Sequence, residues 1–366
     1  MPPDPILQGL DTGDVSALAR AISLVENQRD GFERVLTHVH ERLGRGGTRR
    51  IGITGPPGAG KSTLTEQLIR AFRGVGLKVA VVAVDPTSPF SGGALLGDRI
   101  RMETASTDPG VFIRSMATRG SIGGLATTTE EVCDVLEAFG FERILIETVG
   151  VGQTELDVAR SAETTVLMLV PESGDGIQTL KAGVMEVADV YVINKADRPG
   201  AEQMQREIEI MLGIRRGNAY RHVGAHHGAV GRSRKDSGTV AGGQGVSDPA
   251  ATARPSVRPP AQAPVWEPPV LRTIAPKGEG IPALIEALDR HRAYLEASGR
   301  LAQRRRERLA ERTRAAVNRA VQQWVWEGPG AEAILTQALD DMTAGTRSPY
   351  EVAAEILEQA KSGAPR

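Results

Sequence analysis

Residues 55–62 read GPPGAGKS, and no other segment constrains the fold of this chain as strongly. The segment matches the pattern G-x-x-x-x-G-K-[ST] without departure. It follows the apolar run Ile51–Thr54 and precedes a helical pattern over Ser62–Arg73. Glycines let backbone amides curl around an anion, and the N-terminus of a helix adds its dipole. A strand, a glycine-rich turn and a helix in this order predict a phosphate-binding loop.

Two side chains at the end of this loop carry the chemistry that a nucleotide needs. Lys61 is expected to act as a catalytic cation on the β- and γ-phosphates, and the Ser62 hydroxyl is expected to bind Mg²⁺. The predicted nucleotide contacts of the loop are Gly55, Pro56, Pro57, Gly58, Ala59, Gly60, Lys61, Ser62 and Thr63.

Short apolar runs recur along the chain with helical patterns between them. They are rich in Val and Ile and show little alternation, which is typical of parallel strands buried on both faces. Alternating strands and helices predict an α/β fold with a doubly wound, mostly parallel sheet. The runs are Arg50–Thr54, Lys78–Val84, Arg143–Thr148, Thr164–Val170, Val190–Asn194 and Pro269–Ala275.

Helical patterns also flank this core. Residues 13–43 favour helix, with Asp14 as its N-cap, and further helices are predicted at 281–297, 300–326, 330–342 and 349–360. The Arg-rich face of the second of these four is expected to be solvated, or to meet an acidic partner; its arginines are Arg304, Arg305, Arg306, Arg308 and Arg312.

The predicted organisation has three parts. Residues 1–47 form an N-terminal helical extension, residues 48–280 a nucleotide-binding domain, and residues 281–366 a C-terminal helical region. Residues 217–264 are rich in Gly, Ala, Ser and Pro and are expected to form a flexible insertion. The pair His226-His227 lies in it, where an incidental pair is the simpler interpretation and metal binding the alternative.

The segment Asn194–Asp197, NKAD, points to guanine as the base. It follows the run Val190–Ile193, at the end of a predicted strand. An aspartate carboxylate there accepts hydrogen bonds from guanine N1–H and from the N2 amino group, a pair that adenine does not offer. Asn194, Lys195 and Asp197 are therefore predicted to bind the base of GTP or GDP.

Carboxylates follow several predicted strands, where an open α/β sheet forms its ligand crevice. Glu147 stands where the usual D-x-x-G element has aspartate, and it is expected to hold Mg²⁺ and to act in catalysis, with the Gly150 amide meeting the γ-phosphate. Asp85 and Asp98 are expected in the magnesium or water shell, Asp98 also as a catalytic group. The alternative for both is capping of a following helix or loop.

Other polar residues leave alternatives open. Gln153 is either the residue that orients the attacking water or a structural switch residue, and Lys181, from the residues alone, is a solvated helix charge. Cys133 is expected to be a packing residue. His38, His40 and His291 lack ligand-spaced partners and are expected on the surface or on helix faces.

Composition excludes several classes of protein. The 44 Lys and Arg residues balance 45 Asp and Glu residues, so nucleic-acid binding driven by overall charge is not expected. The single cysteine excludes a disulfide scaffold. With no apolar run of about 18 residues and no secretory leader, we expect a cytoplasmic protein without membrane contact.

Together these motifs resemble the MeaB/ArgK family of phosphate-loop GTPases, over about residues 8–215 and 265–360. The segments that carry the resemblance are GPPGAGKST at 55–63, VDPTSPFSGGALLGDRIRM at 84–102, ETVGVGQTE at 147–155, NKAD at 194–197 and WEPPV at 266–270.

The resemblance implies a P-loop NTPase fold with a G domain of the SIMIBI class and helical N- and C-terminal extensions. It also implies a GTP-hydrolysing chaperone that gates cofactor loading by an adenosyltransferase and protects or reactivates an adenosylcobalamin-dependent acyl-CoA mutase, methylmalonyl-CoA mutase above all. A homodimer built by residues 281–366 is implied as well. Lys181 then falls in a third switch, where it acts in catalysis.

The chain departs from the family pattern where the base loop reads Ile274-Ala275-Pro276 instead of Ser-Ala-x. The Ala275 amide is expected to reach guanine O6, but loss of the serine hydroxyl predicts weaker guanine binding. Two other functions stay open: a P-loop kinase of the transport-associated type, against which NKAD argues, and a nickel-insertion GTPase, whose expected Cys/His elements are missing.

Overall fold

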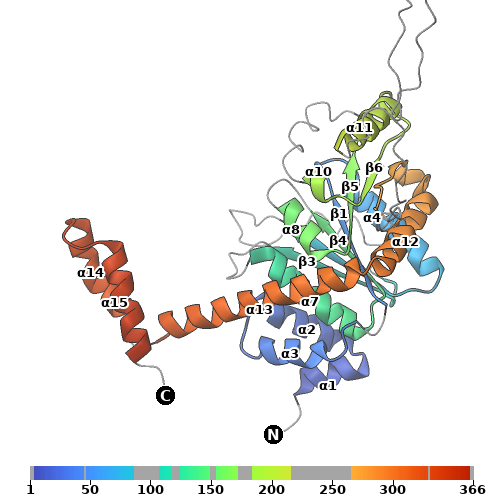
Figure 1. Ribbon diagram of the computed structural model, residues 1–366. Coiled ribbons are helices and arrows are strands. Elements are labelled where there is room, and N and C mark those ends of the chain that lie inside the picture. Colours follow the sequence, from blue (N-terminus) through green and yellow to red (C-terminus); the bar gives the residue numbers. More distant parts are fainter. Residues whose placement is uncertain are drawn as a thin grey trace, which may run out of the picture.

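The computed structural model describes residues 4–44, 47–85, 107–117, 124–148, 154–171, 184–215, 265–328 and 330–362 (Figure 1). At its centre is a seven-stranded sheet with the order β3-β2-β4-β1-β5-β6-β7, and every pair of neighbouring strands is parallel. The predicted α/β fold is confirmed. The strands are β1 (Arg49–Thr54), β2 (Val79–Asp85), β3 (Val111–Ala117), β4 (Arg143–Thr148), β5 (Thr164–Leu169), β6 (Val190–Ile193) and β7 (Val270–Arg272).

Strand β3 is the one described strand that the apolar runs did not predict. It lies at the edge of the sheet beside β2, and its apolar run is interrupted by Arg114 and Ser115. The Arg114 guanidinium turns away from the sheet and donates to Glu26 at 3.0 Å. An edge strand is covered less than a central one, so a charged residue within it is tolerated.

Helices cover both faces of the sheet. On one face lie α4 (Lys61–Gly74) and α12 (Ile281–Ala297), which share an apolar cluster with the side chains of the central strands. The other face carries α7 (Gly124–Phe139), α8 (Thr154–Ser161), α10 (Val184–Val187) and α11 (Ala201–Arg215). The sheet is thus doubly wound, and its strands are buried on both sides, as their unalternated sequence predicts.

The N-terminal segment forms three helices, not the continuous one predicted over residues 13–43. They are α1 (Pro5–Thr12), α2 (Val15–Glu26) and α3 (Phe32–His40), and they pack outside α7. Asp14 caps α2 as expected, since its carboxylate accepts from Ser16 N at 2.8 Å. The break comes from backbone conformation: Gln28 has φ +48° and Gly31 has φ +92°, values that no right-handed helix accommodates.

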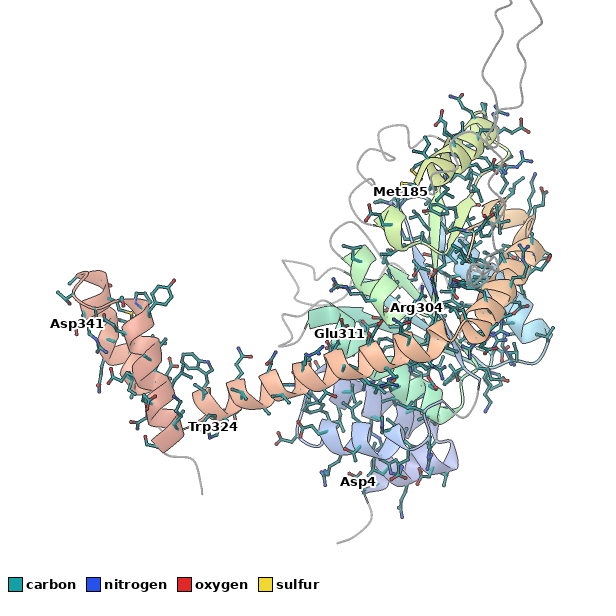
Figure 2. All side chains as sticks on the ribbon, in the orientation of Figure 1. Asp4, Met185, Arg304, Glu311, Trp324 and Asp341 are labelled. Atoms are coloured by element: carbon teal, nitrogen blue, oxygen red, sulfur yellow. The ribbon has the colours of Figure 1, made fainter. Side chains whose placement is uncertain are left out.

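Three helices form a C-terminal arm. Helix α13 (Arg300–Trp326) runs along α7 and past the N-terminal helices, and α14 (Ala331–Thr343) and α15 (Pro349–Ser362) pair beyond its end, away from the sheet (Figure 1). In Figure 2, Arg304 and Glu311 lie where α13 crosses the body, and Trp324 lies near its far end. Ser348 and Glu351 form a capping box that begins α15, with Pro349 first in the helix. Among the described helices, none has a stretch long and apolar enough to cross a membrane.

The Arg-rich face of α13 is not solvated, so that expectation was wrong; its acidic partners belong to the same chain. Glu163, 3% exposed, accepts from Arg305 at 2.8 Å and from Arg292 of α12 at 2.5 Å, and it lies 3.8 Å from Arg308. Arg312 pairs with Asp134 of α7. Arg306 alone of the five arginines is exposed.

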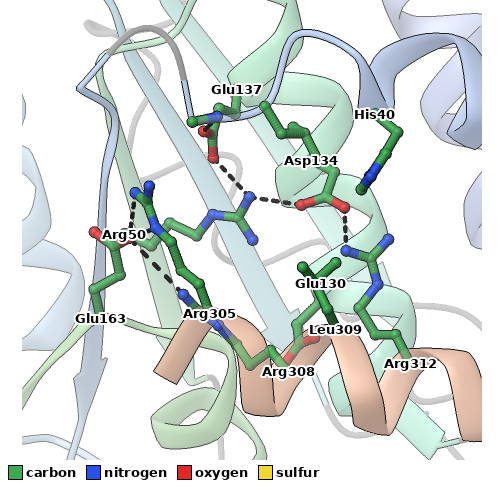
Figure 3. A pocket seen from close by; sticks show the side chains of 12 residues that line it. His40, Arg50, Glu130, Asp134, Glu137, Glu163, Arg305, Arg308, Leu309 and Arg312 are labelled. Carbon is green, nitrogen blue, oxygen red and sulfur yellow. Dashed lines mark hydrogen bonds and ion pairs between the residues drawn. The ribbon is translucent and has the colours of Figure 1, made fainter. Parts of the chain in front are cut away.

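These charged side chains surround a cavity of about 330 Å³ between α13, α7, the end of α3 and the start of β1 (Figure 3). Arg50 spans it from β1, donating to Asp134 at 2.6 Å and to Glu137 at 2.7 Å. Glu130 also lines the cavity and is 5% exposed. The arm therefore docks on the body mainly through buried ion pairs.

His291 lies on helix α12, one of its two expected places, but it is fully buried and not at the surface. Its Nδ1 lies 2.9 Å from the Thr164 hydroxyl, and its Nε2 lies 3.3 Å from an Asp189 oxygen. The ring is covered by Trp266, whose centroid is 4.7 Å away. His38 does lie on a helix face, beside Asp11 at 2.7 Å, and Cys133 is a buried packing residue as predicted.

We predict that Glu130 makes the fold less stable as the pH rises. Burial raises the pKa of its carboxyl from 4.5 to about 7, and Arg308 and Arg312 offset this only in part. The folded state therefore binds the proton more tightly than the unfolded state. The contribution of Glu130 to the unfolding free energy is greatest below about pH 4.5 and falls by roughly 3 kcal/mol as the pH rises through 7.

Glu130→Gln removes this titration. The difference between the unfolding free energies measured with denaturant at pH 5 and at pH 8 is therefore expected to be smaller in the variant than in the parent protein. Glu286→Gln, at an exposed position of α12, is the control and keeps the parent's difference. An unchanged pH dependence in Glu130→Gln would contradict the prediction.

Candidate nucleotide-binding site

The phosphate loop joins β1 to α4 in a conformation that requires its glycines. Gly55, Gly58 and Gly60 have φ values of +143°, +74° and +91°, which side chains larger than glycine rarely adopt. A Cβ on Gly55 would also lie 2.2 Å from the Met168 carbonyl oxygen of β5. The loop therefore keeps close to the neighbouring strand and leads directly into the N-terminus of α4, where backbone amides favour an anion.

Lys61, the first residue of α4, is 7% exposed and turns back over the loop. Its Nζ donates to the carbonyl oxygen of Gly55 at 2.8 Å and to that of Pro56 at 3.2 Å. The ammonium group is thus held above the concave side of the loop, the position from which it can meet phosphate oxygens.

Glu147 of β4 meets the start of α4 from the neighbouring strand. The Ser62 hydroxyl donates to Glu147 Oε1 at 2.6 Å, and the Thr65 hydroxyl donates to Oε2 at 2.7 Å. A hydroxyl oxygen and a carboxylate oxygen are hard donors of the kind that Mg²⁺ prefers. Of the four residues predicted for the metal, Ser62 and Glu147 are therefore brought together, and they fit such an ion.

Asn194, directly after β6, is 2% exposed and connects three loops. Its Nδ2 donates to the Ala59 carbonyl of the phosphate loop at 2.8 Å. Its Oδ1 accepts from the Thr273 hydroxyl and from the Ala275 amide, each at 3.1 Å. The phosphate loop, the NKAD segment and the loop after β7 are thus one connected structure.

The rest of NKAD lies at the surface of this structure. Lys195 has φ +55°, a left-handed conformation that turns the chain sharply after Asn194. Ala196 N then donates to the Thr273 carbonyl at 3.1 Å, and the Asp197 side chain is exposed. An exposed aspartate beside a tightly held turn can accept hydrogen bonds from a base.

The base loop after β7 begins with Ile274, whose N donates to the Glu279 carbonyl at 3.1 Å. A single 3-10 turn, η1 (Ala275–Lys277), follows, with Pro276 exposed in it. The Ala275 amide, expected to face guanine O6, donates to Asn194 Oδ1. Although a serine is missing at position 274, a hydroxyl still supports the loop, because Thr273 supplies it.

Several predicted residues lie outside the described part of the chain: Asp98, Gly150, Gln153, Lys181 and the pair His226-His227. The same holds for the whole insertion at 217–264 and for the side chain of Asp85. The backbone of Asp85 ends β2 next to the carboxyl end of β4, since Ala83 pairs with Glu147.

Two residues of the site were not singled out from the sequence, Thr65 and Thr273. A signal for Thr65 exists, because it lies three positions after Ser62 and hence on the same face of the helix. Thr273 precedes Ile274 in the loop after β7, and nothing local distinguishes it from any other polar residue at the end of a strand.

Comparison with known proteins places this geometry in a family. The family model described as methylmalonyl Co-A mutase-associated GTPase MeaB matches residues 18–330. A Pyrococcus abyssi protein named as a GTPase is 43% identical over 315 residues, which cover 86% of this chain and 84% of that protein.

Two further similarities agree. The mouse protein named methylmalonic aciduria type A homolog, mitochondrial, is 35% identical over 314 residues, 82% of this chain and 66% of that protein. A solved structure described as LAO/AO transport system kinase superposes with a TM-score of 0.60 at 26% identity, covering 97% of this chain and 96% of that chain. The phosphate loop, the NKAD turn and these matches together show that the chain belongs to the MeaB family of P-loop GTPases, which bind GTP and GDP and hydrolyse GTP.

Proposed function

We propose that this GTPase is a chaperone of an adenosylcobalamin-dependent acyl-CoA mutase, methylmalonyl-CoA mutase in the first place. In this role it gates the loading of the cofactor by an adenosyltransferase and protects or reactivates the mutase. The observation that carries the proposal is the match of residues 18–330 to a family described by its association with that mutase. The name of the mouse relative, which refers to methylmalonic aciduria, supports the same partner.

The proposed chemistry is in-line attack of water on the γ-phosphorus of GTP. Lys61 exchanges the carbonyl oxygens of Gly55 and Pro56 for phosphate oxygens and stabilises the charge that develops on them. Ser62 and Glu147 hold Mg²⁺, which when bound neutralises phosphate charge. Further contributors proposed from the sequence are Asp85, Asp98, Gly150, Gln153 and Lys181.

A short path leads from the nucleotide site to the arm and supports nucleotide-dependent signalling to a partner. Helix α8 begins at Thr154, within the segment Val151–Glu155 that we propose senses GTP hydrolysis. At its other end, the Ser161 carbonyl accepts from Arg308 of α13 at 3.3 Å. A conformational change at the first turn of α8 therefore has only this one helix between it and the arm.

A homodimer formed through the arm is also proposed. Helices α13, α14 and α15 enclose a groove of about 730 Å³, lined mostly by apolar side chains that include Val321, Val325 and Ile356. Around it, apolar side chains are exposed in one chain alone: Val321 by 49%, Trp324 by 43% and Leu357 by 48%. A second copy of the same arm would cover this surface.

The test of the partner is GTP hydrolysis with and without purified methylmalonyl-CoA mutase. We expect the mutase to raise the turnover number for GTP by roughly tenfold or more, because groups supplied by a partner complete the site in other GTPases. ATP should not be hydrolysed in either case. No effect of the mutase, or transfer of the phosphoryl group to a protein or an amino acid instead of water, would contradict the proposal.

Asp197→Asn tests the base contact. The variant presents an amino group where guanine also presents one, so we expect the Kd for GDP to rise roughly 100-fold or more. Xanthosine diphosphate has a carbonyl at that position and should bind the variant more tightly than GDP does. Glu202→Gln, an exposed change in the adjacent helix α11, is the control. Unchanged GDP binding by Asp197→Asn, measured by calorimetry, would exclude Asp197 from the base site.

The double variant Val321→Glu with Leu357→Glu tests the dimer. Burying two carboxylates in the proposed interface is unfavourable, so light scattering should report a dimer for the parent chain and a monomer for the variant. Val75→Glu, at an exposed apolar position near the end of α4, should remain dimeric. A monomeric parent chain, or a variant that stays dimeric, would show that the arm does not join two copies.

A further inference from the structure

We infer that Thr65 is a positioning residue of the magnesium site: its hydroxyl fixes the orientation of the Glu147 carboxylate, so that the oxygen facing Ser62 is presented to the ion. This inference rests on the proposed magnesium site. It assigns a role to a residue that lies outside the phosphate-loop motif and four positions after its lysine.

The first observation is the pair of hydroxyls on one carboxylate. Ser62 and Thr65 lie three residues apart on α4 and so share a helix face. They contact different oxygens of Glu147, Ser62 at Oε1 and Thr65 at Oε2. Each oxygen of the carboxylate is therefore held by its own hydroxyl, and the orientation of the carboxylate plane is fixed.

Burial distinguishes the two contacts. Thr65 is fully buried, whereas Ser62 is half-buried at the start of the helix, next to the phosphate loop. Only the Ser62 side of the carboxylate is within reach of an ion held with a nucleotide. The Ser62 hydroxyl must turn from Glu147 to such an ion, while the Thr65 hydroxyl has no reason to leave Oε2.

The identity of residue 147 explains why a second contact is needed. Glutamate has one more rotatable bond than the aspartate of the usual D-x-x-G element, so more conformational freedom is lost when its carboxylate is fixed. A buried hydroxyl that holds one oxygen lowers this freedom before the ion arrives. Groups that orient a metal ligand in this way typically contribute 10- to 100-fold to metal affinity.

The test uses the full-length protein and measures how Mg²⁺ slows the release of a fluorescent GDP analogue, which requires no catalysis. Thr65→Val removes the hydroxyl at nearly constant volume. We expect the Mg²⁺ concentration for half-maximal slowing to rise roughly tenfold or more, while release of the analogue without Mg²⁺ stays unchanged. Thr65→Ser keeps the hydroxyl and should restore the parent's Mg²⁺ dependence.

Two further variants make the outcome decisive. Thr65→Ala also lacks the hydroxyl and should behave like Thr65→Val, so the test survives if one of the two fails to fold. Thr129→Val is the matched control, because Thr129 is a buried helical threonine whose hydroxyl has no hydrogen-bond partner among the described residues. This control should keep the parent's Mg²⁺ dependence.

The results distinguish failure of this inference from failure of the magnesium site on which it rests. If Mg²⁺ does not slow release even from the parent protein, the magnesium site itself is overturned, and the role of Thr65 with it. If the parent responds to Mg²⁺ and both hydroxyl-free variants respond at the same concentration, Thr65 is a packing residue only and the magnesium site stands.

Discussion

The side-chain amide of Asn194 is the interaction on which the candidate nucleotide site depends, because it holds the phosphate loop against the NKAD segment and the loop after β7. The same amide explains why residue 60 is a glycine. A Cβ on Gly60 would lie 2.4 Å from Asn194 Nδ2, so this position excludes a side chain for a reason beyond its φ of +91°. The phosphate loop and the predicted base loops are consequently built as one unit.

At the opposite end of the sheet, the arm depends on charge placement. Glu163 and Asp189 immediately precede β5 and β6, and Arg50 lies near the start of β1, so these charges sit at the amino ends of the strands. Buried ion pairs add little net stability, yet removing one partner typically costs about 3–5 kcal/mol. Such pairs therefore define where α13 docks more than how strongly it is held there.

The sequence predicts most of the fold and the phosphate and base loops because these features are local. A glycine pattern between a strand and a helix, or NKAD after a strand, is specified by residues that are neighbours in the chain. The parts that were mistaken or missed depend on distant partners. The arginines of α13 meet Glu163 and Asp134, more than 140 residues away, and no periodicity in the helix reveals that those carboxylates face it.

His291 and Thr65 illustrate the same limit at single residues. A histidine on a predicted helix gives no sign that Thr164 and Asp189 will lie beside its two ring nitrogens. The spacing of Thr65 from Ser62 places both on one helix face, but the partner of Thr65 becomes visible only when β4 places Glu147 opposite it. Local pattern thus identifies the residues that define a motif, whereas the residues that orient them become visible only when the sheet is assembled.

The nucleotide site and the docking site of the arm lie at opposite ends of the sheet, and the elements that connect them differ in stiffness. Strand β1 (Arg49–Thr54) leads from Arg50 near the arm to the phosphate loop, but it is hydrogen-bonded to β4 and β5 on both sides and cannot shift alone. Helices α7 and α8 are held mainly by side-chain packing, and α7 brings Glu130, Asp134 and Glu137 to the cavity that α13 closes. Packed helices slide more readily than paired strands. We therefore expect that any effect of the nucleotide on the arm passes through these two helices, by way of the ion pairs of α7 with α13 and the hydrogen bond from Arg308 to the Ser161 carbonyl of α8.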